Sequence, residues 1–89
     1  MYTPGTIIGQ DYVIERLIGK GGMGVVYEAT HRIMQQRFAV KVLSADQLSE
    51  QNWMRFQREA QALARLNHQN IVKVYNLGID RESYPYYVM

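Results

Sequence analysis

The stretch Gly19-Lys20-Gly21-Gly22-Met23-Gly24, followed at once by Val25-Val26-Tyr27, decides the fold. The residues before it, Tyr12–Ile18, are rich in β-branched and aromatic side chains, and so are residues 25–30 after it. Both flanks therefore predict strands. The glycines lie in the turn of a hairpin and do not open a helix.

Gly19, Gly21 and Gly24 have the spacing of phosphate-binding loops, which is weak evidence by itself. A turn that needs glycine only to reach positive φ would contain the same residues. A dinucleotide-binding loop leads into a helix, and the loop of a phosphate-binding NTPase ends in Gly-Lys-Ser/Thr. Neither feature follows here. A glycine turn between two strands instead allows backbone amides to approach a triphosphate without an intervening side chain.

Outside this hairpin the sequence predicts a sheet interrupted by one helix. Met1–Gln10 has no clear period and reads as a lead-in segment. Three more strands are expected, at residues 38–43, 71–77 and 84–89, with a polar turn at 78–83. The expected fold class is α+β: a five-stranded antiparallel sheet with one long helix against one face.

The helix is expected over residues 44–66, which contain no glycine or proline and no β-branched residue. Ser44 and Gln47 fit a capping box at its start. Apolar side chains recur at three- and four-residue spacing and form one stripe: Trp53, Phe56, Ala60 and Leu63.

Lys41 alternates with Ala39 and Leu43 on one face of its predicted strand. A lysine in an apolar strand is costly to bury without a partner. Glu59 is the candidate partner, because it lies on the packed side of the helix. The alternative for Glu59 is an exposed carboxylate that pairs with Arg55 along the helix.

Five segments, taken in order, resemble the N-terminal lobe of a bacterial-type serine/threonine protein kinase, with the match covering residues 11–89. They match the glycine-rich loop, the third-strand lysine motif, the stretch around the helix glutamate, the turn into the fourth strand, and the end of the fifth strand: Gly19–Tyr27, Ala39–Lys41, Phe56–Glu59, Asn67–Val72 and Tyr87–Met89. Gln69 stands where the family usually has proline.

The resemblance implies the ATP-binding half of an enzyme that transfers the γ-phosphate of ATP to protein serine or threonine hydroxyls. It implies that Lys41 and Glu59 position the phosphates, and that Met89 is the gatekeeper. The implied nucleotide-binding residues are Ile18, Gly19, Lys20, Gly21, Gly22, Met23, Gly24, Val26, Ala39, Lys41, Glu59 and Met89. No metal ligand is expected in this chain. The catalytic base and the Mg²⁺ ligands would lie beyond Met89, so the chain is expected to end at the hinge and to be inactive alone.

Two alternatives remain open at this point: a pseudokinase that binds nucleotide without transfer, and a stand-alone regulatory module built on the lobe. The expected partners are ATP, protein substrates and the missing C-lobe. A homodimer through the lobe is also expected, since the Lys41 face, part of the helix stripe and an edge strand rich in tyrosine would be uncovered.

Composition narrows the remaining classes of protein. The chain has 89 residues, no cysteine and a net charge of +2, which fits one small domain. Its basic residues are scattered among acids, so no nucleic-acid partner is expected. No apolar stretch in the 89 residues is long enough to span a membrane, and no secretory signal is expected, because Met1–Gln10 has neither a basic start nor an apolar centre. A cytoplasmic location is expected, with a downstream membrane anchor left open.

Overall fold

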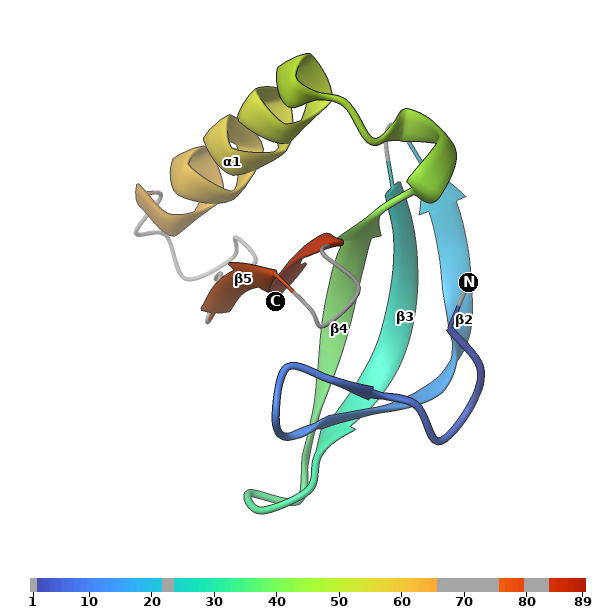
Figure 1. Ribbon diagram of the computed structural model, residues 1–89. Coiled ribbons are helices and arrows are strands. Elements are labelled where there is room, and N and C mark those ends of the chain that lie inside the picture. Colours follow the sequence, from blue (N-terminus) through green and yellow to red (C-terminus); the bar gives the residue numbers. More distant parts are fainter. Residues whose placement is uncertain (1, 22–23, 66–75, 80–83) are drawn as a thin grey trace.

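The computed structural model of the protein describes residues 2–21, 24–65, 76–79 and 84–89. It confirms the α+β class, with one long helix against an antiparallel sheet (Figure 1). The sheet has six strands in the order β1-β2-β3-β4-β6-β5, instead of the five expected. The elements are β1 (Ile7–Ile8), β2 (Tyr12–Gly21), β3 (Gly24–His31), β4 (Gln36–Leu43), the 3₁₀ turn η1 (Ala45–Gln47), α1 (Glu50–Arg65), β5 (Asn76–Ile79) and β6 (Pro85–Val88).

The additional strand, β1, comes from the segment that the sequence predicted to be only a lead-in. It pairs antiparallel with the start of β2, and its Ile8 is fully buried. Gly9 then turns the chain with a φ of 65°. A Cβ atom on Gly9 would lie 2.6 Å from the Tyr86 hydroxyl, so this turn accepts no larger residue without rearrangement. A strand of two residues is too short to show a periodic pattern in the sequence.

The glycine-bearing hairpin forms as predicted, because β2 pairs antiparallel with β3 along its whole length. Its register shifts twice, between Ile14 and Arg16 and between Leu17 and Gly19. Such an irregularity changes which face of the sheet the following side chains reach. Gly22 and Met23, at the tip of the turn, lie outside the described residues.

The last two strands differ from the prediction in their bounds and in which of them lies at the sheet edge. Gly78 and Ile79 were expected in a turn but belong to β5, while residues 71–75 lie outside the described part. Position 78 favours glycine, because a Cβ atom there would lie 2.8 Å from the Tyr86 hydroxyl. β6 lies between β4 and β5, so the strand that carries Tyr86 and Tyr87 is an interior strand and not the expected edge.

The helix begins later than predicted. Gln47 ends the 3₁₀ turn η1 and Ser44 directly precedes that turn; the Gln47 amide donates to the Ser44 carbonyl at 2.9 Å. The N-cap of α1 is Ser49: its Oγ accepts from the Asn52 amide at 3.1 Å, and its carbonyl accepts from the Trp53 amide at 2.8 Å. The predicted capping box was therefore wrong, and the next serine along the chain takes that role.

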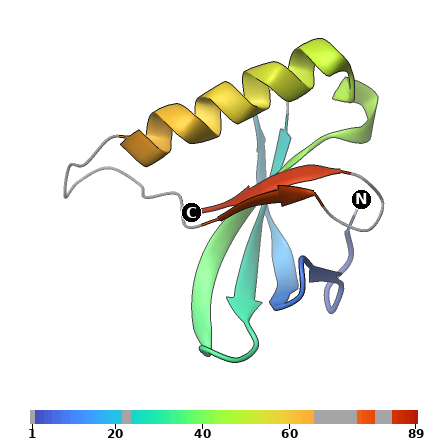
Figure 2. The ribbon, with the colours of Figure 1, turned by 60° about the vertical axis from the view of Figure 1, so that its left-hand side comes forward.

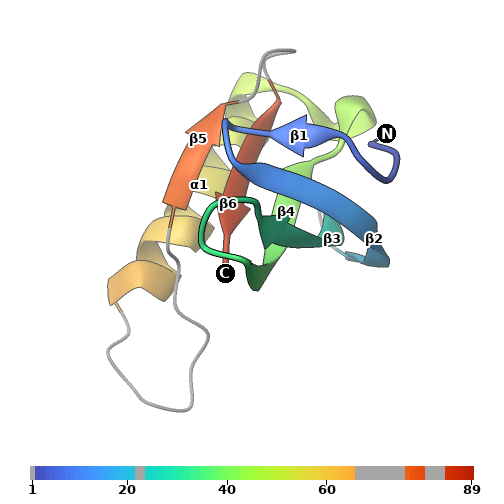
Figure 3. The same cartoon turned by 90° about the horizontal axis from the view of Figure 1, so that it is seen from below.

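The sheet has apolar side chains on both faces, and α1 covers only one of them (Figure 2). On the face toward α1, Leu43 and Tyr87 pack against Phe56 and Ala60, all four buried, which confirms the predicted helix stripe. The opposite face carries the larger cluster: Ile8, Ile14, Val25, Tyr27, Ala29, Phe38, Val40, Val42, Tyr86 and Val88. Figure 3 shows this face, with β1 at its margin and α1 behind the sheet.

The position of the helix cap can be tested by two matched substitutions. Ser49→Ala should lower the free energy of unfolding by about 1 kcal/mol, because the Asn52 amide loses its acceptor. Ser44→Ala should change it by less than about 0.5 kcal/mol, since its side chain caps no helix. Urea unfolding followed by the fluorescence of Trp53 measures both. Equal losses in the two variants would contradict this assignment.

Candidate functional site

A row of paired residues crosses three strands on the face toward α1. Val26 of β3 lies opposite Lys41 of β4, which in turn lies opposite Tyr87 of β6. Two residues before Lys41 in β4, Ala39 exchanges two backbone hydrogen bonds of 2.9 and 2.7 Å with Met89. The two-residue period of the strands therefore brings together, on one face, side chains that are far apart in the sequence.

Lys41 pairs with Glu59 of the helix. Its Nζ donates to Glu59 Oε1 at 2.7 Å, and the two side chains are 15% and 38% exposed. A half-buried ammonium held by a carboxylate gives a charge-assisted hydrogen bond, which is stronger than one between neutral groups. The alternative pairing of Glu59 with Arg55 does not occur among the described residues.

Tyr87 is a third member of this group, and its role was not predicted from the sequence. Its hydroxyl donates to the same Oε1 of Glu59, and its ring lies against Phe56 with centroids 5.0 Å apart. The Lys41 Nζ lies 5.9 Å from the centroid of the Tyr87 ring, within the range of a cation–π contact. Tyr87 is 2% exposed, and a buried tyrosine hydroxyl requires a partner. A tyrosine in a strand predicted to be packed needs a partner for its hydroxyl, and this need was the signal in the sequence that could have identified Tyr87.

These contacts set the ionisation of the group. Burial alone would raise the pKa of Glu59, but the hydrogen bonds from Lys41 and Tyr87 and the positive charge of Lys41 lower it below its usual value. Burial, and then the hydrogen bond to Glu59 and its charge, raise the pKa of Tyr87. Tyr87 therefore stays protonated and remains a donor, while Glu59 stays an anion that accepts two hydrogen bonds.

The glycines of the hairpin divide into two kinds. A Cβ atom on Gly24 would lie 2.7 Å from the Val42 carbonyl oxygen and 3.2 Å from Lys41 Cε, so internal packing explains that glycine. A Cβ atom on Gly19 or Gly21 would meet nothing within 4 Å, and neither residue has a positive φ. Neither packing nor backbone conformation requires glycine at these two positions. A ligand that contacts the bare backbone of the turn would require glycine at both positions.

Not every predicted contact side chain reaches this face. Lys20 lies opposite Val25, whose side chain packs in the cluster on the other face of the sheet. A role for Lys20 in nucleotide binding would therefore depend on its backbone amide. Ile18 lies within the register shift after Leu17 and is 50% exposed. Gly22 and Met23, which were also predicted to contact the nucleotide, lie outside the described residues.

No group of three or more potential metal-ligating side chains gathers anywhere in the described part of the chain. The charges at the candidate site are the ammonium of Lys41 and the carboxylate of Glu59, joined in one pair. The site can therefore offer a cation, a bare backbone turn and an apolar floor to a ligand. This combination suits an anionic ligand with a flat apolar part.

Comparison with known proteins agrees with this geometry. Residues 12–89 match the protein kinase domain family. The serine/threonine-protein kinase PrkC of Bacillus subtilis is 42% identical over 86 residues, and a probable serine/threonine-protein kinase of Streptomyces coelicolor is 43% identical over 86. These matches cover 96% and 92% of the chain, which spans only 13% of the length of either relative.

A solved structure gives the same result for the fold. The crystal structure of the PknI kinase domain of Mycobacterium tuberculosis superposes with a TM-score of 0.74 at 31% sequence identity. The superposition covers the whole of this chain and 36% of the solved one. The similarity therefore concerns one part of a larger domain.

The ionisation of Glu59 can be measured directly by a carbon-detected NMR titration of its carboxyl group. In the unmodified protein its pKa should lie below the usual glutamate value, and in Tyr87→Phe it should rise toward that value because one donor is lost. In Lys41→Met it should rise further, because burial is no longer offset by the ammonium. Identical titrations in all three proteins would show that these contacts do not form.

The lowered pKa of Glu59 also determines how the free energy of unfolding depends on pH. A carboxyl group whose pKa is lowered by folding stabilises the protein above its unfolded pKa, and this contribution is lost as pH falls through the folded pKa. Acid should therefore lower the free energy of unfolding more in the unmodified protein than in Glu59→Gln.

Proposed function

We propose that the chain, which belongs to the protein kinase family, forms the ATP-binding half of an enzyme that transfers the γ-phosphate of ATP to serine or threonine hydroxyls of proteins. The observation that carries this proposal is the Lys41–Glu59 pair, 2.7 Å long, on the sheet face toward the helix and beside the glycine turn. Phosphoryl transfer depends chiefly on positioning and on neutralising charge, and a fixed ammonium supplies both.

In this proposal each part of the site has its own task. Val26 and Ala39 contact the adenine ring, with Met89 as the gatekeeper at the back. The backbone of the glycine turn covers the phosphates, which is consistent with the open space around Gly19 and Gly21. Lys41 binds the α- and β-phosphates, and Glu59 and Tyr87 hold its ammonium in place.

Residues 11–89 then form the N-lobe of a larger kinase domain, with residues 1–10 before it. A second lobe outside this chain supplies the base that accepts the hydroxyl proton and the ligands for Mg²⁺, which neutralises phosphate charge. We therefore expect the 89 residues alone to transfer no phosphate. The remaining partners are protein substrates, and we expect the protein to act in the cytoplasm. Within the described residues no helix is long and apolar enough to cross a membrane.

The proposal is tested in the parent protein by Lys41→Met, which keeps the apolar stem and removes the charge. We expect kcat/KM to fall by roughly a thousandfold, as for other groups that stabilise transition-state charge. Glu59→Gln should reduce activity less, because the lysine remains but is poorly oriented. Transfer of labelled phosphate to a protein substrate measures both, with circular dichroism to check the fold.

Near-normal turnover in Lys41→Met would overturn the assignment of Lys41. An unmodified parent that binds ATP and transfers nothing would favour the pseudokinase alternative.

Self-association through this lobe is a further part of the proposal. β5 is one of the two edge strands of the described sheet, and its Leu77 and Ile79 are 36% and 57% exposed. Exposed apolar side chains on a sheet edge favour association with a second copy. Light scattering over a concentration series should show a rising average mass that Ile79→Lys reduces. A monomer at every concentration would contradict this expectation.

A further inference from the structure

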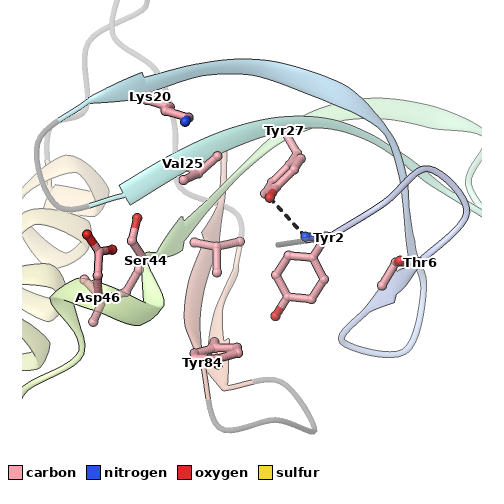
Figure 4. Close-up of a pocket in the computed structure, with 10 residues that line it drawn as sticks. Tyr2, Thr6, Lys20, Val25, Tyr27, Ser44, Asp46 and Tyr84 are labelled. Atoms are coloured by element: carbon pink, nitrogen blue, oxygen red, sulfur yellow. Dashed lines mark hydrogen bonds between the residues drawn. The ribbon is translucent and has the colours of Figure 1, made fainter.

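A cavity lies on the sheet face opposite the candidate nucleotide site. Its volume is about 480 Å³, within the usual range for small-molecule sites. Four parts of the chain line it: the N-terminal segment, the glycine-bearing hairpin, the end of β4 with the following 3₁₀ turn, and the residue before β6 (Figure 4). Val25 and Val42 contribute to its apolar wall, whereas Val26 and Lys41, their neighbours in the chain, face the other way.

The walls of this back cavity suit a flat ring. Tyr2 and Tyr27 meet edge to face, with centroids 5.8 Å apart and planes at 82°, and the Tyr2 amide donates to the Tyr27 hydroxyl at 3.2 Å. Tyr84 lies across the cavity from Val25 in Figure 4. Aromatic side chains give a large apolar contact area with defined orientation. A planar aromatic ligand would use these surfaces best.

Two opposite charges line the same cavity. Lys20 lies on the hairpin and Asp46 on the 3₁₀ turn, and Figure 4 shows them at separate positions around the cavity. Both side chains are exposed, and among the described residues neither forms an ion pair or a hydrogen bond. A neutral carboxamide offers an acceptor to an ammonium and a donor to a carboxylate. A ligand with a net charge would be attracted by one of the two groups and repelled by the other, whereas a neutral donor–acceptor ligand can satisfy both.

We propose that the back cavity is a second small-molecule site, which binds a neutral, planar aromatic molecule that carries a carboxamide or an equivalent donor–acceptor pair. Lys20 and Val25 flank the turn that holds Gly21 and Gly24, so a bound molecule ties that turn to the end of β4. If the proposed ATP binding holds, occupancy of the back cavity changes ATP affinity, and ATP changes the affinity of the cavity by the same factor.

The test is a methyl NMR titration of the protein with naphthalene-2-carboxamide. A compound of this size should bind with a Kd of about a millimolar. The methyl signals of Val25 and Val42 should shift in a saturable way. The methyl signals of Val26, on the other face, are an internal control and should shift much less than those of Val25 and Val42.

Variants and analogues make the test specific. Ser44→Trp should abolish the shifts by filling the cavity, and Asp46→Asn should weaken binding roughly threefold to tenfold. Glu50→Gln is the matched control, because it removes an exposed carboxylate that does not line the cavity. 2-Naphthoate should bind no more tightly than the carboxamide, because its attraction to Lys20 is offset by repulsion from Asp46 and it has no donor for the Asp46 carboxylate.

Shifts at Val26 in place of Val25, unchanged binding in Ser44→Trp, or tighter binding of the naphthoate would each overturn the proposal. So would the absence of any saturable shift. These readouts do not involve ATP, so failure of the proposed kinase function would leave the result for the back cavity intact.

Discussion

The ammonium of Lys41 lies between the sheet and the helix, where only 15% of its side chain is exposed, and it must be neutralised there. Glu59 provides the charge, and Tyr87 fixes the carboxylate by a second hydrogen bond to the same oxygen. Because the three residues come from β4, α1 and β6, one group of contacts defines how the helix lies on the sheet. The packing of Phe56 against Leu43 and Tyr87 supports the same arrangement with apolar contacts.

The two faces of the sheet consequently have different tasks. Toward α1, the strands present a charged pair beside small and apolar side chains, which is a polar site on an apolar floor. On the opposite face, the same strands contribute Val25, Val40 and Val42 to the larger core. Alternation within β3 and β4 separates the two environments by a single residue. This separation allows the hairpin to have a candidate nucleotide site in front and a cavity behind it.

Much of this arrangement could be predicted from the sequence, because its patterns are long. The alternation in residues 38–43 predicted that Lys41 lies on the strand face away from Phe38, Val40 and Val42. The stripe from Trp53 to Leu63 predicted that Glu59 lies on the packed side of the helix. The joint spacing of five segments indicated the protein kinase family. Features that depend on a few residues were missed. β1 is only two residues long, and the cap moved from Ser44 to Ser49 because a 3₁₀ turn intervenes.

The face reached by Lys20 shows a second reason for such misses. Leu17 lies opposite Tyr27, and an unbroken register would place Ile18 opposite Val26, with Lys20 on that same face. The irregularity after Leu17 instead brings Gly19 opposite Val26 and turns Lys20 to the other face. The inserted residue shifts the phase of the period-two pattern, but Gly19, Lys20 and Gly21 after it have no apolar side chain that would reveal the shift. The hydroxyl of Tyr87 was missed because its partner lies 28 residues away, on the helix.

The central claim is that the Lys41 face, and not the Lys20 face, receives the phosphates. An acyl phosphate of ATP tests it, because such a reagent acylates an amine that lies beside the bound phosphate chain. The protein is treated with the reagent, digested, and mapped by mass spectrometry, with and without excess ATP. We predict acylation of Lys41 that excess ATP suppresses, and no ATP-sensitive acylation of Lys20. ATP-sensitive acylation of Lys20 with Lys41 unmodified would contradict the account.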